Sequence, residues 1–439
     1  MISIKELYNK DITEKLNKKK VTLLGYVHEV RNIGSIIFLL VRDNTGIRQV
    51  TALKKDIKPE IFKEFSKIPK ESVVKIDGIV NANKEAPNNV EVLLNNFEIL
   101  SKAASVLPLE VTEKAPALQA QRLDFRSVDL RKPKNLAIFK IQSKLIEGMQ
   151  EYLHNNNFIQ VNTPCIMGAA SEGGADVFKL DYFGKEAFLR QDPQLHRQLT
   201  IAAGFEKIFD LGPSWRAELS HTVKHLCEYR SCAVEMAFID DETDTMKIEQ
   251  ELVVNAIKKV IQDCKEELEL LDIKLSIPKT PFPELRFPKI YEILGKKPDK
   301  VKHHDLDAKD EKKLYEYVKE KYKTDFYFIN RFPSMLKPFY VMKVDETPEY
   351  ARSVDLYFKG LELSSGGQRE HRYDKLMENI KERNLNLKNL EWFTKFFRFG
   401  VAPHGGFAIG IERLTKNLLN LENIRDTTLF VRDPDRLLP

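Results

Sequence analysis

Short β-rich runs separated by turn residues fill the first quarter of the chain, and this pattern limits its fold more than any other feature. The runs cover residues 21–30, 36–42, 47–52, 73–80 and 90–99, and a helical stretch at 58–68 follows the third run. The turn Asp43-Asn44-Thr45-Gly46 joins the second run to the third. Five strands with one helix after the third are the order of an OB barrel. Another small β-barrel with a purely structural role remains open as the alternative.

A connector and a larger second domain follow the barrel. Residues 103–135 contain Pro108, Pro116 and Pro133 and a polar run at 119–122, a composition typical of a linker. A chain of 439 residues is too long for one ordinary core. We therefore expect an OB-fold domain at 1–102, a linker at 103–135 and a second domain at 136–439.

The second domain is expected to be α+β, with an antiparallel sheet flanked by helices. Its first helix is predicted at 135–154, where apolar residues fall on one helical face, and it leads into a strand at 158–161. Further strands are predicted at 187–190, 207–211, 231–238, 326–328, 339–343 and 353–358. Further helices are predicted at 193–203, 245–267 and 309–321.

Composition excludes several classes of protein. The net charge of +5 is small, so any nucleic-acid surface must be a local patch rather than a global excess. The four cysteines form no C-x-x-C pair, which favours reduced thiols and argues against disulfides or a structural metal. No apolar signal segment and no run of about 18 apolar residues occurs. We expect a cytoplasmic protein that neither is secreted nor spans a membrane.

Two segments carry residues suited to a nucleotide. The sequence lacks G-x-x-x-x-G-K-[ST] and a G-x-G-x-x-G loop after a strand, so arginines and a cation would have to hold a triphosphate. Residues 213–229 indicate a hairpin offering Arg216 for phosphate, Tyr229 for base stacking and His225 as a cationic donor. Residues 404–414 alternate small residues before Arg413, which begins a helix. Taken singly, each arginine is more often a member of a surface ion pair than a phosphate ligand.

Together the two segments resemble motifs 2 and 3 of the class II aminoacyl-tRNA synthetases. Residues 157–164 (NFIQVNTP) resemble motif 1, which lies at the dimer interface in that family, so a homodimer is expected. A narrower resemblance is carried by residues 170–174 (ASEGG), 191–198 (QDPQLHRQ), 355–356 (DL) and 362–371 (ELSSGGQREH). These resemble the aspartyl-tRNA synthetases of the archaeal and eukaryotic type, and the similarity runs from about residue 21 to residue 439.

The resemblance implies an ATP site. Arg216 would bind the α-phosphate and offset the charge that develops there, while Tyr229 stacks on adenine. Glu218 would fix the nucleotide or the terminal adenosine of tRNA. The implied contacts to the rest of ATP, including its γ-phosphate end, are His225, Leu226, Glu362 and Arg413. No protein nucleophile is needed, because the substrate carboxylate attacks ATP directly and the implied catalytic residues position it: Arg216, Glu218, Arg369 and Arg413.

Magnesium is the implied cofactor beside ATP. Glu362 and Asp355 are hard oxygen ligands suited to a Mg²⁺ ion that bridges the phosphates, and Ser365 is a further contact. The alternative is that the two acids are ordinary surface residues at strand ends.

Aspartate is the implied amino acid. Arg369 would clamp its side-chain carboxylate as a fork, and Gln194 with Ser171 would hold its amino end. Glu172 and Ser365 are further implied contacts. The alternative for Ser171 and its neighbouring glycines is a plain turn.

Three positions near this pocket depart from the aspartyl pattern. The motif Q-S-P-Q-x-x-K-Q has Asp192 in place of serine and Arg197 in place of lysine, and Ala233 stands where an acidic residue is expected. Losing that carboxylate would leave the substrate ammonium poorly compensated, at a cost of roughly 2–5 kcal/mol. We hypothesise that Asp192 replaces it. Because Arg197 is larger than lysine, aspartate could sit differently or another acid could be preferred.

The barrel bears on which tRNA is charged. Phe38 stands where an aromatic stacks on an anticodon base in the resembled family, and Arg31 and Gln49 are further implied tRNA contacts. His28 and Pro87 are the residues that the non-discriminating enzymes of that family, which charge two different tRNAs, carry at these positions. We therefore expect charging of both tRNA(Asp) and tRNA(Asn), with an amidotransferase that completes Asn-tRNA(Asn). The alternative is that these two residues have no bearing on specificity.

Three other functions remain open. A synthetase-like paralogue could adenylate a different acid, although a retained anticodon barrel argues against it. A catalytically inactive RNA-binding protein would not need Arg216, Glu362, Arg369 and Arg413. An asparaginyl enzyme is disfavoured because Arg369 suits an anionic side chain.

Overall fold

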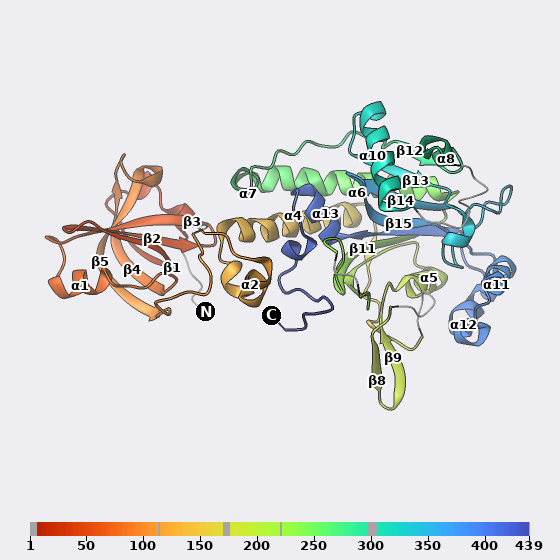
Figure 1. Cartoon of the computed structure of the whole chain (residues 1–439), viewed down its shortest axis with the longest axis horizontal. Helices are drawn as coiled ribbons and strands as arrows, with labels where there is room; N and C mark the ends of the chain where they lie inside the picture. The colour runs from red at the N-terminus through yellow and green to blue at the C-terminus, as the bar shows by residue number, and fades with distance from the viewer. Residues whose placement is uncertain (1–6, 113–114, 170–175, 220–221, 297–305, 439) are drawn as a thin grey trace. The chain divides into compact units, whose positions relative to one another are not determined.

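The first part of the chain folds as a closed five-stranded barrel in the computed structural model (Figure 1). Its strands are β1 (Lys20–Asn32), β2 (Ile36–Asp43), β3 (Gly46–Leu53), β4 (Val73–Ala82) and β5 (Val90–Ser101), paired in the order β1-β2-β3-β5-β4. Helix α1 (Pro59–Phe65) follows β3 and buries Phe62 and Phe65 in the barrel core. The predicted OB fold is confirmed, including its helix.

The structure describes residues 7–112, 115–169, 176–219, 222–296 and 306–438. The chain divides into two units, Met1–Leu136 and Ala137–Pro439. The segment predicted as a linker contains two short helices, α2 (Gln119–Asp124) and α3 (Arg126–Asp129). Across the described residues, each helix is too short or too polar to span a lipid bilayer.

The second unit is built on an eight-stranded sheet with the order β12-β13-β14-β15-β16-β11-β10-β6. Its strands are β6 (Ile159–Gln160), β10 (Lys207–Trp215), β11 (Glu228–Ala237), β12 (Glu284–Arg286), β13 (Phe326–Asn330), β14 (Ser353–Phe358), β15 (Leu361–Arg369) and β16 (His404–Gly410). Neighbouring strands are antiparallel except β6 with β10 and β12 with β13. The expected α+β class is confirmed.

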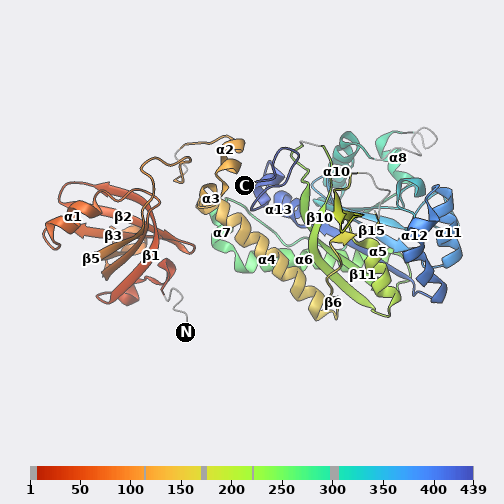
Figure 2. The same ribbon diagram turned by 90° about the horizontal axis from the view of Figure 1, so that it is seen from below.

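Two long helices, α4 (Pro133–Asn155) and α6 (Glu242–Asp263), cover one face of this sheet (Figures 1 and 2). They approach closely at Gly148, where an added Cβ would lie 2.9 Å from Ala256 Cα. From β11, Cys232 and Val234 point into the core beneath the two helices. Because side chains alternate along a strand, the odd-numbered residues of β11 belong to the other face.

The remaining described helices surround the sheet. They are α5 (Gln194–Ala202), α7 (Lys265–Leu270), α8 (Lys289–Leu294), α10 (Ala308–Tyr322), α11 (Tyr373–Glu382), α12 (Leu387–Thr394) and α13 (Ile411–Leu418). A separate three-stranded sheet contains β7 (Ile166–Met167), β8 (Lys179–Tyr182) and β9 (Lys185–Leu189), and its β8–β9 hairpin projects from the unit (Figure 1).

Three predicted elements differ from the structure. The strand predicted at 187–190 belongs to β9 and lies outside the main sheet. The strand predicted at 339–343 makes only isolated bridges, from Val341 to Arg369 at the end of β15 and from Lys343 to Ala351, and these two bridges do not join into a ladder. The helix predicted at 245–267 breaks at Cys264, whose φ of −119° and ψ of 35° are not helical. Apolar periodicity continues through the break and cannot register it.

Glu249 is a fully buried acid on α6 that contacts the sheet. Ser364 Oγ of β15 donates a hydrogen bond to its Oε1, and Oε2 has no partner among the described residues. Burial, and to a lesser degree the charge of Asp355, raises the pKa of Glu249 from 4.5 to about 8, against the opposing hydrogen bond from Ser364. The folded protein therefore holds a proton there at neutral pH, which the unfolded chain releases.

Replacing this acid should change how stability depends on pH. A folded pKa above the unfolded one favours folding below pH 4.5, and this contribution is lost as the pH rises toward 8. Between pH 5 and pH 9, Glu249→Gln should gain roughly 2–4 kcal/mol of unfolding free energy relative to the unchanged protein. Urea denaturation at both pH values measures this. Glu266→Gln, at an exposed position of α7, serves as the control, and parallel pH curves for Glu249→Gln and the unchanged protein would contradict the prediction.

Candidate active site

A cavity of about 360 Å³ opens against β11, β15 and β16 on the face that α4 and α6 leave uncovered. Most of the predicted site residues line it together: Asp192, Gln194, Arg216, Glu218, His225, Leu226, Tyr229, Glu362, Ser365, Arg369 and Arg413. These residues come from segments far apart in the chain, and the sheet brings them to one place. Ser171 and Glu172 lie outside the described residues.

The hairpin β10–β11 provides one end of the cavity. The two strands pair from Lys207 with Met236 to Trp215 with Glu228, so that Arg216 and Glu218 follow the end of β10. The Arg216 side chain is 45% exposed, and its Nη1 lies 3.3 Å from Glu218 Oε1. An accessible guanidinium beside the cavity is suited to an anionic ligand.

His225 lies at the same end of the cavity. Its Nε2 is 3.8 Å from Glu218 Oε2. Burial lowers the pKa of His225, and the Arg413 and Arg216 guanidinium groups lower it further, while Glu218 opposes them. The imidazole is therefore mainly neutral at pH 7, and it can offer a hydrogen bond without a full charge.

Arg413 lies in the first turn of α13 and faces β15. Its Nη1 donates to the Glu362 carbonyl oxygen at 3.1 Å and to Glu362 Oε1 at 3.5 Å. The preceding residue, Glu412, also lines the cavity and accepts the Arg230 backbone N–H at 3.0 Å. Burial raises the pKa of Glu412 to about 7. Glu412 was not predicted from the sequence, although its position next to Arg413 was a signal for it.

The β14–β15 hairpin carries two carboxylates, Asp355 and Glu362, that influence each other electrostatically. Burial and the neighbouring Asp355 raise the pKa of Glu362 to about 7, while Arg413 opposes this shift. Asp355 is buried behind the cavity wall, where Lys337 Nζ donates to its Oδ2 at 2.6 Å. Its Oδ1 is buried and has no partner among the described residues. Lys337 lines the cavity and was not predicted, because no motif contains it.

These two acids fit a magnesium ion that is shared with phosphates. No group of three or more His, Cys, Asp or Glu side chains within the described ranges could by itself hold a metal. Mg²⁺, however, is typically bound by one or two carboxylates together with substrate phosphates and water. The unpartnered Asp355 Oδ1 and the neighbouring Glu362 supply such a pair.

A network of charged and amide groups closes the other end of the cavity. Arg369 Nε donates to Glu235 Oε1 at 3.0 Å, and its Nη2 donates to Gln194 Oε1 at 3.1 Å and to the Gly406 carbonyl at 3.0 Å. Gln194 Nε2 in turn donates to Glu235 Oε2 at 2.9 Å. Arg369 Nη1 is not buried and has no hydrogen-bond partner among the described residues. Arg369 therefore presents a donor to the cavity from a fixed position.

Two residues predicted to contact the amino acid do not line the cavity. Arg197 is fully buried on α5, behind Asp192 and Gln194. Ala233 is buried on β11, on the same strand face as Ser231 and Glu235. Sequence spacing could not reveal that Arg197 points away from the cavity, because that direction depends on its partner Asp192.

The barrel carries the predicted tRNA-binding residues by itself. Phe38 of β2 pairs with Arg31 of β1, and both are outside the barrel core. His28 sits at a bulge in β1, where Arg42 Nη1 donates to its Nδ1 at 2.9 Å. Burial and Arg42 lower the pKa of His28. Pro87 begins an exposed 3-10 turn, Pro87–Asn89.

Glu91 connects two of these barrel positions and was missed from the sequence. Gln49 Nε2 donates to its Oε2 at 3.1 Å, and Asn83 Nδ2 donates to its Oε1 at 2.9 Å. Asn83 begins the loop that contains Pro87, since its backbone N–H bonds to the Asn89 carbonyl at 2.9 Å. A single carboxylate thus fixes Gln49 and this loop together.

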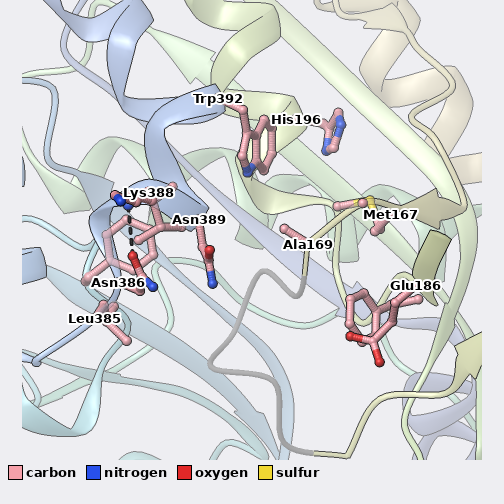
Figure 3. A pocket seen from close by; sticks show the side chains of 13 residues that line it. Met167, Ala169, Glu186, His196, Leu385, Asn386, Lys388, Asn389 and Trp392 are labelled. Carbon is pink, nitrogen blue, oxygen red and sulfur yellow. Dashed lines mark hydrogen bonds between the residues drawn. The ribbon is translucent and has the colours of Figure 1, made fainter.

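A larger cavity of about 680 Å³ lies elsewhere on the same unit (Figure 3). Trp392 and His196 form one side of it and Glu186 another, while Asn386 accepts the Lys388 backbone N–H at 3.0 Å. The described residues that line it include no arginine. The smaller cavity therefore remains the candidate active site, because its charged groups converge on one space.

Two family models match the two folded units of the chain. Residues 118–434 match the model described as tRNA synthetases class II (D, K and N). Residues 21–100 match the model described as an OB-fold nucleic acid binding domain. The chain belongs to the class II aminoacyl-tRNA synthetases, in the group that the first model describes.

Individual relatives narrow this assignment. The chain is 44% identical to the aspartate–tRNA(Asp) ligase of Pyrococcus furiosus, over 98% of this chain and 99% of the relative. It is 41% identical to the aspartate–tRNA(Asp/Asn) ligase of Archaeoglobus fulgidus, over 99% of this chain and 100% of the relative. Among solved structures, an asparaginyl-tRNA synthetase from Pyrococcus horikoshii with bound asparaginyl-adenylate has a TM-score of 0.92 at 34% identity, with 100% of both chains covered.

Gly406 should be intolerant of any side chain. An added Cβ would lie 2.0 Å from the Val234 carbonyl oxygen and 2.6 Å from Glu235 Oε2, so β16 would have to move away from β11. We expect Gly406→Ala to lose about 1–3 kcal/mol of unfolding free energy or more. Gly410→Ala is the matched control on the same strand, because its Cβ would meet no atom closer than 3.7 Å. Equal losses for the two variants in urea denaturation would contradict the prediction.

Proposed function

We propose that this enzyme is an aspartate–tRNA ligase. The aspartate carboxylate attacks the α-phosphate of ATP and releases pyrophosphate, and the aspartyl group then passes from the adenylate to a ribose hydroxyl at the 3′ end of tRNA with release of AMP. The observation that carries the proposal is the buried Arg369, which lines a cavity bounded at its other end by Arg216 and Arg413 and whose Nη1 has no partner among the described residues. A guanidinium at this depth suits an anionic side chain. The names of the curated relatives from Pyrococcus and Archaeoglobus support the same substrate.

The proposed chemistry depends on positioning and charge. Arg216 binds the α-phosphate, where negative charge develops as the aspartate carboxylate attacks in line. Tyr229 stacks on adenine, and Arg413 holds the γ-phosphate end. His225 adds a hydrogen bond from a neutral imidazole, and Glu218 orients the Arg216 side chain through the contact at 3.3 Å. Leu226 completes the nucleotide wall.

Magnesium would be held by Glu362 and Asp355, with Ser365 beside them. When bound, the ion neutralises phosphate charge and holds the triphosphate in shape. Lys337, which donates to Asp355 at 2.6 Å, adds a fixed positive charge at the same end of the cavity.

The barrel would read the anticodon of tRNA(Asp) and also of tRNA(Asn). An outward-facing Phe38 offers a stacking surface for a base, and His28 and Pro87 match the pattern of the non-discriminating enzymes. An amidotransferase would then convert Asp-tRNA(Asn). The segment 157–164, with Ile159 52% exposed, is proposed as the homodimer contact, and the cytoplasm as the location.

Asparagine is the competing substrate, because of the structural likeness to the asparaginyl enzyme. ATP–pyrophosphate exchange with each common amino acid separates the candidates. Exchange with aspartate alone is expected, since asparagine would leave its amide N–H₂ unpaired against Arg369. Exchange with asparagine alone would overturn the proposed substrate, and exchange with a different acid would identify a paralogue. No exchange with any amino acid would indicate an inactive RNA-binding protein.

Charging of tRNA(Asp) and tRNA(Asn) transcripts tests the proposed tRNA partners in the same preparation. We expect aspartate on both transcripts. Aspartate on tRNA(Asp) alone would contradict the proposal that the barrel accepts both anticodons, while the proposal that aspartate is the amino acid would stand.

A further inference from the structure

The last segment of the chain is hydrogen-bonded to the connection between β10 and β11. The Ile424 backbone N–H donates to the Val223 carbonyl oxygen at 3.0 Å, and the Cys227 N–H donates to the Arg432 carbonyl oxygen at 2.8 Å. The Cys227 carbonyl oxygen in turn accepts the Arg216 N–H at 3.0 Å. Ile424 also lines the candidate active site. The segment 424–432 therefore supports the connection that carries part of the proposed ATP site.

Arg425 is the side chain that joins this segment to the connection. Its Nε donates to Asp433 Oδ2 at 2.7 Å, and both side chains of this ion pair are buried. Its Nη1 donates to the Thr222 carbonyl oxygen at 3.2 Å. The same carbonyl oxygen lies 3.5 Å from the His225 backbone nitrogen and closes a turn there. Arg425 therefore holds the main chain at the start of the turn that carries His225.

The Thr222 side chain determines which nitrogen of His225 can donate. Its Oγ1 lies 2.5 Å from His225 Nδ1, and His225 Nε2 lies 3.8 Å from Glu218 Oε2. A mainly neutral imidazole carries one ring hydrogen, and a carboxylate can only accept. The hydrogen is therefore placed on Nε2, and the Thr222 hydroxyl donates to Nδ1. In this tautomer His225 offers an Nε2–H donor at the nucleotide end of the cavity.

We propose that Arg425 is a positioning residue for ATP: through the Thr222 carbonyl it holds the turn in which the Thr222 hydroxyl orients His225 for the phosphates. This inference rests on the proposed function, in which His225 contacts ATP. Arg425 is not among the described residues that line the cavity, so it acts through Thr222 rather than on the nucleotide. A turn that is held before ATP arrives costs less conformational entropy when ATP binds.

Arg425→Gln tests this role, because glutamine is too short to reach both Asp433 and Thr222. Calorimetric titration with ATP and Mg²⁺, without an amino acid, measures the dissociation constant for ATP in the absence of turnover. We expect this constant, and the KM for ATP in ATP–pyrophosphate exchange, to rise about tenfold or more. The KM for aspartate should stay within about threefold, since Arg425 contacts none of the groups at the Arg369 end of the cavity.

Two further single variants guard against a general loss of folding. Arg425→Lys keeps the buried charge beside Asp433, but one ammonium group cannot span Asp433 and Thr222, so the ATP constants should still rise about fivefold or more. Arg331→Gln is the matched control, since Arg331 forms a buried ion pair with Glu242 in the same unit and does not line the cavity. It should leave the dissociation constant for ATP within about threefold.

A double-mutant cycle tests whether Arg425 acts through Thr222. Thr222→Val removes the hydroxyl that orients His225 and keeps the shape of the side chain. Alone, it should raise the dissociation constant for ATP about fivefold or more and leave the KM for aspartate within about threefold. Adding Arg425→Gln to Thr222→Val should raise the ATP constant by less than about threefold more, because the two changes break the same chain of contacts.

The outcomes separate this inference from the proposed function. If the unchanged protein fails to activate aspartate, the proposed function fails. If it activates aspartate but Arg425→Gln and Arg425→Lys leave ATP binding unchanged, or raise the ATP and aspartate constants in equal proportion, only the positioning role fails. Full additivity in the cycle would also overturn the proposal, because Arg425 and Thr222 would then act independently. A selective loss of ATP binding that is not additive supports it.

Discussion

The buried contact between Glu235 and Arg369 is the interaction on which the rest of the site depends. Glu235 lies on β11 and Arg369 at the end of β15, and β16 runs between these two strands. Arg369 reaches Glu235 across β16 at the level of Gly406, whose carbonyl it also contacts at 3.0 Å. Glu235 faces Gly406 in the strand register. Because a Cβ at Gly406 would collide with Glu235, glycine is needed there for the pair to form.

This pair divides the cavity into two chemically different ends. At the inner end, Arg369 and Arg197 are buried and their charges are neutralised by Glu235 and Asp192. At the outer end, the Arg216 side chain is 45% exposed and that of Arg413 is 28% exposed. Preformed buried pairs suit the recognition of a small amino acid by shape and hydrogen bonding. Accessible arginines suit a triphosphate that brings its own charge.

The sequence predicted the parts of this structure that depend on local patterns. The barrel strands alternate in hydrophobicity and are interrupted by turns, and both signals are local. The segments around Arg216 and Arg413 were found as motifs, and the cavity contains both. The strand predicted at 339–343 does not form a ladder. A strand forms only where another strand pairs with it along its length, and the sequence alone does not say which segment that would be. The break in the helix at Cys264 was not predicted, because apolar residues keep their helical spacing on both sides of it.

What the sequence did not predict is which side chains pair with one another in the site. Arg197 was predicted as a pocket residue, but it is buried behind Asp192. This placement depends on how α5 packs on β11 and on the contact of Gln194 with Glu235, neither of which the sequence shows. Lys337 was not predicted because its function follows from Asp355 on β14, whereas Lys337 itself lies just after the 3-10 turn Ser334–Leu336. Glu91 was not predicted for the same reason. Its function follows from accepting hydrogen bonds from both Gln49 and Asn83, which lie elsewhere in the sequence.

Direct binding of aspartate and asparagine tests most directly whether the neutralised inner end selects an anionic side chain. Isothermal titration calorimetry of the full chain, with a non-hydrolysable ATP analogue and Mg²⁺ present, measures both dissociation constants. The geometry of Arg369 predicts tighter binding of aspartate by about 100-fold or more, because asparagine leaves buried polar groups unpaired. Equal affinities, or tighter binding of asparagine, would contradict the central role of the Glu235–Arg369 pair in choosing the substrate.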